Sequence, residues 1–456
     1  MHIHILGISG TFMSALAILA KQKGYKVTGN DTACYPPISD LLKEHDIEFI
    51  DSYDDKTMML AADEVIVGNA MKRGMPIIEL LLNNRKKYIS GPEWLAREVL
   101  DDKQVIAVAG THGKTTVTTM LALILEQAGF APGYLIGGVP QCLDSSAKLG
   151  AGKYFVIEAD EYDTAFFDKR PKFIHYRPYG LILHNLEFDH ADIYSSLEDI
   201  QLQVHYLLRT VPQNGWLVRP CVENGIDGAI ELGVYSPAFC WAWEENSDAR
   251  IELIAEDGSE FKIKTKFGEA AVKWDLIGQH NVENAVAAIL ASYKLGVPLQ
   301  QAADILKDYR AVKRRMEVCF QHQDLSVYDD FAHHPTAIER TTLAIRNTHK
   351  HDRVIGIVDF ASNSMRAGHH LKKMAKALRY VDEIFVLQSE EFDMAAQARN
   401  WPCKVNIKSN VDDLVAELLD KTQHKDGIVI MSNKGLGLLK TKLLASLRNE
   451  FFTSQS

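Results

Sequence analysis

The segment that most constrains the fold is residues 105–129, with the sequence VIAVAGTHGKTTVTTMLALILEQAG. Its first part, Val105–Ala109, is a continuous apolar run that predicts a buried strand, and the spacing of apolar residues after Lys114 predicts a helix. Between them, Gly110 and Gly113 allow backbone N–H groups to turn inward around phosphate oxygens, beside the positive end of the helix. The segment therefore predicts a phosphate-binding loop that joins a strand to a helix.

The side chains of this loop indicate that its ligand is ATP. In loops of this kind a lysine contacts the β- and γ-phosphates and a threonine hydroxyl binds Mg²⁺, and we assign these roles to Lys114 and Thr115. The spacing departs from the usual GxxxxGK[ST] pattern, because only Thr111 and His112 separate the two glycines unless Ala107 replaces the first one. A turn that merely joined a strand to a helix would not require lysine followed by threonine. The candidate ATP-binding residues of the loop are Gly110, Thr111, His112, Gly113, Lys114, Thr115 and Thr116.

Elsewhere the chain repeats an alternation of short apolar runs and helical segments. This alternation is typical of βαβ units and predicts an α/β fold with mainly parallel sheets. The length of 456 residues is enough for about three domains. A small antiparallel β-insertion is expected within residues 215–275 of the central domain. We predict a Rossmann-like domain over residues 1–103, a P-loop ATPase-like domain over 104–313 and a second Rossmann-like domain over 314–456.

Composition narrows the class of protein. The formal net charge of −10 argues against a nucleic-acid or membrane-surface binder, since phosphate neutralisation needs basic surfaces. The six cysteines are scattered and contain no C-x-x-C pair, which favours reduced thiols over a disulfide or zinc framework. The first twenty residues lack the positive region of a signal peptide. We expect a cytoplasmic protein whose partners are small molecules, and the sequence leaves its oligomeric state open.

A group of carboxylates follows the apolar run YFVIEA, which is expected to form a strand. Glu158, Asp160, Glu161 and Asp163 are close enough to repel one another unless a cation neutralises some of them. A carboxylate at the end of a strand beside a phosphate loop is where Mg²⁺ is commonly held, so we predict that role for Glu158. Glu161 is expected in a solvated acidic turn.

Three further polar blocks follow apolar runs or precede helices. In LILHNLEFDHADIY, Asp189 and His190 are candidates for a second cation or a phosphate. In GQHNVENAV, Asn281 is expected to cap a helix, which leaves His280 unexplained. In VYDDFAHHPTAI, Pro335 is well placed for the first turn of a helix, and the preceding Asp and His residues indicate a loop that faces a ligand.

The first thirty residues resemble a Rossmann unit with an unusual glycine pattern. Gly7 and Gly10 are spaced as G-x-x-G, not as G-x-G-x-x-G. Asp31 follows the second expected strand, where an acidic group can bind a ribose hydroxyl. This domain is therefore expected to bind a nucleotide-linked substrate, while the central domain binds ATP.

Taken in order, the blocks GTHGKTT, EADEYD, DH, GQHN, RR and DDFAHHP resemble the Mur ligase family. Members of this family are three-domain, ATP-dependent amide-bond ligases of cell-wall assembly. The resemblance covers nearly the whole chain, and the set of blocks is far more specific than any one of them. It implies ATP and Mg²⁺ as cofactors.

Within the family, GISGTFMSALA, VIVGNAMKRGMP and EADEYDTAFFDKR are most similar to ligases that join UDP-N-acetylmuramate to a murein tripeptide, L-Ala-γ-D-Glu-meso-diaminopimelate. The alternative is a ligase that adds L-alanine to UDP-N-acetylmuramate, which shares the phosphate loop and the DH and HHP blocks. A rival from another class is a nucleotide-switched binding module without ligation. That rival leaves the carboxylate and histidine clusters unexplained.

The resemblance also implies roles for individual residues in a reaction that passes through an acyl phosphate. Lys114, Glu158 and His190 are the implied catalytic residues. The implied metal ligands are Thr115, Glu158 and His190. The residues implied to complete the ATP site are His280, Asn281, Arg315 and Asp330.

Two more groups of residues are implied for the other substrates. The residues implied to bind the UDP-sugar are Gly7, Ser9, Gly10, Thr11 and Asp31. The residues implied to bind the peptide are His333, His334, Ser362, Asn363 and Arg366. Ala361 occupies a position where the family has arginine, so the peptide carboxylate would need Arg366 or another group.

Overall fold

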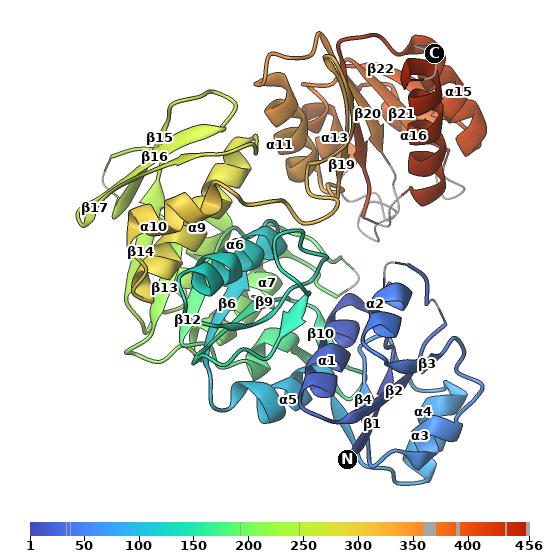
Figure 1. Ribbon diagram of the computed structural model, residues 1–456, viewed down its shortest axis with the longest axis vertical. Coiled ribbons are helices and arrows are strands. Elements are labelled where there is room, and N and C mark those ends of the chain that lie inside the picture. The colour runs from blue at the N-terminus through green and yellow to red at the C-terminus, as the bar shows by residue number, and fades with distance from the viewer. Residues whose placement is uncertain are drawn as a thin grey trace.

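The computed structural model describes residues 1–32, 34–36, 38–191, 193–245, 247–358, 371–388, 393–433 and 436–452. The chain forms three α/β units, each built on its own sheet, which confirms the predicted fold class. The units follow one another from the blue N-terminus to the red C-terminus (Figure 1). No helix of the described ranges is both long and apolar enough to cross a bilayer.

The first unit has a five-stranded parallel sheet in the order β3-β2-β1-β4-β5. Its strands are β1 (His2–Leu6), β2 (Lys26–Asn30), β3 (Glu48–Ile50), β4 (Glu64–Val67) and β5 (Tyr88–Ser90). Its helices are α1 (Thr11–Gln22), α2 (Ile38–Glu44), α3 (Thr57–Ala61), α4 (Pro76–Asn83) and α5 (Gly91–Leu95), and a π-helical turn, η1 (Ala96–Leu100), follows. The strand order is that of a Rossmann-like sheet.

The central unit has a ten-stranded sheet in which the strand before the phosphate loop lies between β12 and β9. Its strands are β6 (Gln104–Ala109), β7 (Gly133–Leu135), β8 (Ala147–Lys148), β9 (Tyr154–Ala159), β12 (Gly180–Leu183), β13 (Trp216–Pro220), β14 (Ala238–Ala242), β15 (Ala249–Leu253), β16 (Glu260–Thr265) and β17 (Gly268–Lys273). Its helices are α6 (Lys114–Gln127), α7 (Leu197–Leu208), α8 (Asn224–Glu231), α9 (Gln279–Lys294) and α10 (Leu299–Leu306).

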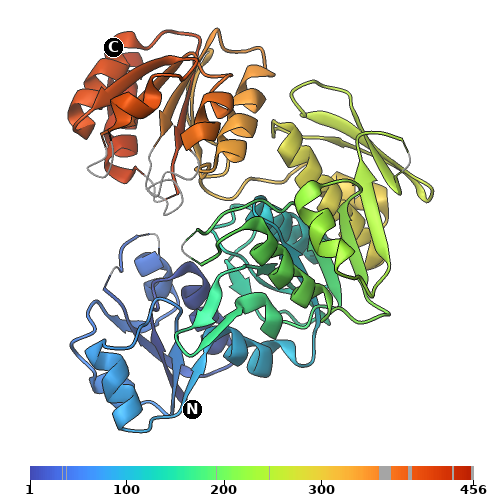
Figure 2. The ribbon, with the colours of Figure 1, turned by 180° about the vertical axis from the view of Figure 1, so that it is seen from behind.

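The antiparallel part of this sheet is narrower than the sequence predicted. We expected an antiparallel insertion across residues 215–275, but β13 and β14 continue the parallel order from β12. Within residues 215–275, only the three strands from Ala249 to Lys273 pair antiparallel to one another. They extend the same sheet at the end farthest from the first unit (Figure 2).

The third unit has a six-stranded sheet in the order β18-β19-β23-β20-β21-β22, with β18 antiparallel to the rest. Its strands are β18 (Glu317–His322), β19 (Leu325–Asp330), β20 (Arg353–Val358), β21 (Glu383–Leu387), β22 (Lys404–Lys408) and β23 (Asp426–Met431). Its helices are α11 (Pro335–Arg346), α13 (Leu371–Ala377), α14 (Met394–Ala398), α15 (Val411–Lys421) and α16 (Gly437–Phe452). Pro335 opens α11, as the sequence predicted.

Strand β6 is covered on both faces, which explains its uninterrupted apolar sequence. Val105 and Ala107 belong to one buried cluster, and Ile106 and Val108 belong to another on the opposite face. The first of these clusters also contains residues of α1 and α5, so the first and central units share one apolar core. This shared core fixes the position of the first sheet relative to the phosphate loop.

A short hairpin gives a second connection between these two units. It consists of β10 (Asp163–Ala165) and β11 (Asp168–Pro171), and a 3₁₀ turn, η2 (Lys172–His175), follows. At its tip, Phe166 packs against the second apolar cluster of the first unit, and the ring of Phe167 lies 5.1 Å from that of Tyr88. The hairpin lies beside α1 in Figure 1. The chain that leaves the acidic strand β9 is therefore anchored on the first unit.

The cysteines differ from the prediction in one respect. Cys221 and Cys240 form a disulfide, whereas the sequence favoured six reduced thiols. The two residues lie on or just after the parallel neighbours β13 and β14, which places their Cα atoms 4.8 Å apart, within the range that a disulfide requires. Spacing along the chain could not reveal this pairing, because it depends on which strands are neighbours.

The core of the central unit gives a test of the fold. Phe155 of β9 is fully buried, and a Cβ added at Gly133 would lie only 2.4 Å from its ring. We expect Phe155→Ala to lower the free energy of unfolding by about 3–5 kcal/mol, because it leaves a cavity in close-packed surroundings. Urea denaturation followed by tryptophan fluorescence measures this change. Val222→Ala, at a position that is 79% exposed, is the control and should change the value by less than about 0.5 kcal/mol.

Candidate active site

The phosphate loop is shaped by two glycines that no other residue could replace without strain. Gly113, with φ of +82°, precedes the first residue of α6, and Gly110 has φ of +147°. A Cβ at Gly113 would lie 2.4 Å from Oδ1 of Asn284, and a Cβ at Gly110 would lie 3.0 Å from the backbone oxygen of Asn185. The loop therefore requires glycine both for its backbone conformation and for its close packing.

A side chain from the neighbouring strand holds the loop open. The carboxamide of Asn185, just after β12, accepts a hydrogen bond from the backbone N–H of His112 at 2.8 Å and donates one to its carbonyl at 3.0 Å. The backbone N–H of Thr111 donates to the carbonyl of Asn185 at 3.1 Å. No motif in the sequence assigned a specific role to Asn185. Its position after a strand that neighbours β6 was the available indication.

The lysine of the loop is paired with two carboxylates. Its Nζ lies 2.9 Å from Oε2 of Glu161 and 3.6 Å from Oδ1 of Asp160. Burial opposes the charge, but these two carboxylates hold the pKa of Lys114 above its ordinary value. The ammonium group is therefore charged and available to exchange a carboxylate for a phosphate.

The prediction that Glu161 lies in a solvated turn is wrong. Its side chain is only 8% exposed, and it accepts hydrogen bonds from both Lys114 and His190. The chain turns back at the end of β9, which directs this carboxylate at the start of α6. The run of acidic residues suggested a surface turn, because the sequence does not show that Lys114 and His190 face Glu161 in the fold.

Glu158 and Thr115 lie at the ends of neighbouring elements and face each other. The hydroxyl of Thr115 donates to Oε2 of Glu158 at 3.1 Å, and the backbone N–H of Gly137 donates to Oε1 at 2.5 Å. Burial raises the pKa of Glu158, although the Gly137 N–H and the charge of Lys114 act in the opposite direction. A half-buried carboxylate beside a threonine hydroxyl at a phosphate loop is a suitable set of oxygen donors for Mg²⁺.

His190 is held beside the same cluster. Its Nε2 lies 2.9 Å from Oε1 of Glu161, and its ring lies 4.2 Å from that of Tyr162. The residue has φ of +56°, a left-handed conformation that is uncommon for a non-glycine residue and that directs the imidazole inward. Burial lowers the pKa of His190, but the hydrogen bond and charge of Glu161 outweigh burial and raise it. An imidazole next to a carboxylate suits a second divalent cation.

The third unit reaches the phosphate loop through a residue that precedes β18. Nη2 of Arg315 lies 3.4 Å from the hydroxyl of Thr115, and its guanidinium lies 4.6 Å from the ring centre of Phe331. Asp330 is buried and accepts a hydrogen bond from the backbone N–H of Met316 at 2.7 Å. Burial raises the pKa of Asp330, and the charge of Arg315 opposes this. Asp330 thus holds the segment that carries Arg315.

The two adjacent histidines of the third unit have different environments. His334 caps α11, and its Nδ1 lies 3.6 Å from a carboxylate oxygen of Glu187 in the central unit. The same oxygen accepts a hydrogen bond from the hydroxyl of Thr336 at 2.7 Å. His333 bonds through Nδ1 to the carbonyl of Phe331 at 2.9 Å. Three residues predicted to bind the peptide lie outside the described part of the chain: Ser362, Asn363 and Arg366.

At the start of α9, the predicted helix cap is wrong. Gly278 occupies the capping position, and Asn281 lies in the first turn, where its Nδ2 donates to the carbonyl of Ile277 at 2.8 Å. Nδ2 of Asn284 then donates to Oδ1 of Asn281 at 3.3 Å, so both amides lie on the side of the helix that faces the loop. Burial lowers the pKa of His280 to about 4, and its buried Nδ1 has no hydrogen-bond partner among the described residues.

The predicted nucleotide-binding residues of the first unit gather at the carboxyl ends of β1 and β2. Asp31 accepts hydrogen bonds from the backbone N–H of Ser9 at 2.9 Å and from its hydroxyl. The hydroxyl of Tyr53 donates to the other oxygen of Asp31 at 3.1 Å. Gly7 has φ of +81°, Gly10 occupies the cap position of α1, and Thr11 begins that helix. A helix start beside a fixed carboxylate suits a phosphate and a ribose.

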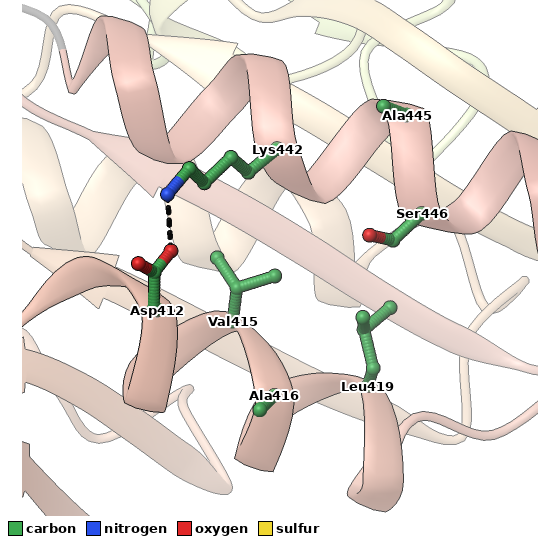
Figure 3. Close-up of a pocket in the computed structure, with 7 residues that line it drawn as sticks. All are labelled: Asp412, Val415, Ala416, Leu419, Lys442, Ala445 and Ser446. Carbon is green, nitrogen blue, oxygen red and sulfur yellow. Dashed lines mark hydrogen bonds and ion pairs between the residues drawn. The ribbon is translucent and has the colours of Figure 1, made fainter.

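A separate hollow lies between α15 and α16, far along the chain from the phosphate loop. Figure 3 shows that its walls are mostly small and apolar, and that the ion pair of Lys442 with Asp412 closes one end. Its lining residues are Asp412, Val415, Ala416, Leu419, Lys442, Ala445 and Ser446. It includes none of the residues of the candidate site.

Comparison with known proteins agrees with the arrangement described above. Residues 2–102 match the description "Mur ligase family, catalytic domain", residues 108–292 match "Mur ligase middle domain", and residues 314–434 match "Mur ligase, glutamate ligase domain". A relative from Haemophilus influenzae is 44% identical over 98% of this chain and 99% of its own length. It is named UDP-N-acetylmuramate–L-alanyl-γ-D-glutamyl-meso-2,6-diaminoheptandioate ligase.

Two more comparisons distinguish relatives of different activity. A solved murein peptide ligase from Psychrobacter arcticus is 41% identical, with a TM-score of 0.78, and the match covers 98% of this chain and 99% of that one. A UDP-N-acetylmuramate–L-alanine ligase from Syntrophomonas wolfei is 32% identical over 76% of this chain and 74% of its own length. Sequence identity is therefore higher toward the peptide ligases than toward this alanine ligase.

The pairing of His190 with Glu161 gives a pH-dependent test. We expect Glu161→Gln to lower the pKa of His190, because burial then acts without the carboxylate that favours the imidazolium. NMR titration of the His190 ring in both proteins measures this change. In the wild type, the pairing stabilises the fold at low pH, and that stabilisation is lost as the pH rises through the pKa of His190.

The control for this titration is Asp163→Asn. Asp163 pairs with Lys169 in the nearby hairpin, so its loss should leave the His190 titration unchanged. An unchanged pKa of His190 in Glu161→Gln would contradict the described pairing.

Proposed function

The chain belongs to the Mur ligase family, and we propose that it is an ATP-dependent ligase that joins UDP-N-acetylmuramate to the tripeptide L-Ala-γ-D-Glu-meso-diaminopimelate. The observation that carries the proposal is the convergence of two neighbouring elements on one buried cluster. Lys114 and Thr115 come from the start of α6, and Glu158 and Glu161 come from the end of β9 and the turn after it. The greater similarity to peptide ligases than to the alanine ligase supports the choice of tripeptide.

In the first step, a carboxylate oxygen of the muramate lactyl group attacks the γ-phosphorus of ATP. The bond between that phosphorus and the β–γ bridging oxygen breaks, ADP leaves, and an acyl phosphate forms. Lys114 would exchange Glu161 for the γ-phosphate and stabilise its developing charge, together with the backbone N–H groups at the start of α6. Arg315, 3.4 Å from Thr115, would add charge on the side of the third unit.

The donor set fits Mg²⁺ at two places. Thr115 and Glu158 would hold one ion, and His190 with Glu161 would hold another. When bound, Mg²⁺ supplies charge neutralisation between two anionic reactants. The pairing of Lys114 with Glu161 has a similar effect in the unliganded site, because it keeps the buried carboxylates from repelling one another.

In the second step, the neutral α-amine of the L-Ala residue attacks the acyl carbon. The bond from that carbon to the phosphate oxygen breaks, inorganic phosphate leaves, and the nitrogen loses one proton as the amide forms. We assign His333 and His334 to the peptide entrance, since His334 lies between the third unit and Glu187 of the central unit. His280, Asn281 and Asp330 are assigned to the nucleotide. The reaction uses ATP and a UDP-linked sugar, which supports the expected cytoplasmic location.

Product mass tests this function. The purified enzyme is incubated with ATP, Mg²⁺ and UDP-N-acetylmuramate, together with either the tripeptide or L-alanine. We expect the product with tripeptide to form much faster than the product with L-alanine. Faster formation of the alanine product would favour the alternative ligase. ATP hydrolysis that is independent of UDP-N-acetylmuramate would favour a nucleotide-switched module.

A variant of the phosphate loop tests the assigned chemistry. We expect Lys114→Ala to reduce ADP formation by more than about 100-fold, because the charge on the transferred phosphoryl group loses its fixed cation. The fold should persist, and an unchanged far-ultraviolet circular dichroism spectrum would show that the secondary structure is retained. Lys148→Ala removes a surface lysine that pairs with Glu126, and it should retain full activity. Wild-type ADP formation by Lys114→Ala would mean that the site is assigned wrongly.

A further inference from the structure

A second buried lysine lies beside the phosphate-loop cluster, and the reaction scheme above does not use it. Lys172 is the first residue of η2, just after the hairpin β10–β11, and its side chain is 10% exposed. Its backbone N–H donates to the carbonyl of Tyr162 at 3.0 Å, which fixes its main chain against the acidic segment. A lysine is rarely buried unless its charge has a partner.

The ammonium group of Lys172 lies where the first and central units meet. Nζ is 3.3 Å from Oδ2 of Asp160, its only ion-pair partner among the described residues. It also lies 5.5 Å from the ring centre of Phe12 and 5.6 Å from that of Tyr162. Phe12 belongs to the first turn of α1, next to the residues assigned to the UDP-sugar, and the ring of Tyr162 lies at a tilt against that of His190. The charge is thus between the sugar site and the phosphoryl-transfer site.

The two lysines share one carboxylate. Oδ1 of Asp160 lies 3.6 Å from Nζ of Lys114, and Oδ2 lies 3.3 Å from Nζ of Lys172. Burial raises the pKa of Asp160, but the charges of Lys172 and Lys114 outweigh burial and lower it to about 2. The two ammonium groups are therefore separated by the width of one carboxylate, with Lys114 on the ATP side and Lys172 on the side of the first unit.

Besides the charge that Mg²⁺ would supply, a cation fixed on the side of the first unit would favour the approach of the acyl donor. Its carboxylate has to approach an anionic γ-phosphate beside a cluster that already contains Glu158, Asp160 and Glu161. Lys114 is occupied by the phosphates during this approach. A carboxylate that arrives from the first unit without a partner would be repelled, and in a buried site this repulsion is only weakly screened.

We propose that Lys172 binds the lactyl carboxylate of UDP-N-acetylmuramate and directs it at the γ-phosphate. The proposal deepens the proposed function and rests on it. Lys172 is then the residue that distinguishes a sugar that carries an acid from the same UDP-sugar without one. Its partial pairing with Asp160, through one oxygen at 3.3 Å, leaves the remaining ammonium hydrogens for the substrate.

The experiment compares two ligands that differ by this acid. Binding of UDP-N-acetylmuramate and of UDP-N-acetylglucosamine, which lacks the lactyl group, is measured by isothermal titration calorimetry. The proteins are the wild type, Lys172→Met, Lys172→Arg and the matched control Lys169→Met, which removes an exposed lysine from the hairpin that precedes Lys172. We expect Lys172→Met to bind UDP-N-acetylmuramate about 10- to 100-fold more weakly, while its affinity for UDP-N-acetylglucosamine changes less than about twofold.

The other proteins complete the test. Lys172→Arg keeps the charge and should recover most of the affinity for the acid-bearing sugar, and Lys169→Met should bind both ligands as the wild type does. An equal loss of affinity for both ligands in Lys172→Met would mean that the residue contacts the nucleotide or sugar that they share. That result would overturn the proposal. Unchanged binding of both would overturn it as well.

A double variant separates substrate binding from a purely structural role. If Lys172 served only to neutralise Asp160, Asp160→Asn would restore the affinity lost in Lys172→Met, and that result would overturn the proposal. We expect no such recovery. Thermal melting of each variant checks that the fold is retained. Failure of the wild type to bind UDP-N-acetylmuramate would contradict the proposed function itself, whereas normal binding and ligation by Lys172→Met would contradict only the role of Lys172.

Discussion

The site is organised by the need to hold three carboxylates close together in one small space. Glu158, Asp160 and Glu161 could not all remain charged there without cations, because desolvation and mutual repulsion both favour their protonation. Lys114 meets two of them and His190 meets one, each at hydrogen-bond distance or slightly beyond. The cluster is therefore a set of charges that is neutralised internally and that can exchange partners when anionic ligands arrive.

Sheet topology brings these charges together. Strands β6, β9 and β12 are parallel neighbours, so the segments that follow them emerge at the same edge of the sheet. The phosphate loop follows β6, the carboxylates follow β9, and Asn185 and His190 follow β12. Parallel α/β sheets bind ligands at this edge for the same reason. The glycines of the loop then allow its backbone to approach Asn185 and Asn284 closely.

Local sequence was sufficient to predict the phosphate loop, the start of α11 and the α/β class, because each depends on residues that are neighbours along the chain. The strand Val105–Ala109, the glycines and Pro335 all have the expected conformations. It was insufficient where partners lie far along the chain. The burial of Glu161, the disulfide of Cys221 and the parallel course of β13 and β14 depend on which strands are neighbours. The cap of α9 was mistaken because Asn281 bonds backward from the first turn, and Gly278 begins the helix.

The apolar core that joins the first and central units affects which units could be exchanged between related proteins. Residues of α1 and α5 pack in the same cluster as residues of β6 and β9. The buried members of the two clusters of the third sheet all belong to the third unit, and Ile277 of the central unit packs against one of them. Exchanging the third unit with that of a relative would therefore disturb mainly polar contacts such as Thr336 with Glu187. Exchanging the first unit would alter one side of the apolar core that it shares with the central unit. Chimaeric proteins joined between the central and third units should thus tolerate more sequence divergence between the parents than those joined between the first and central units.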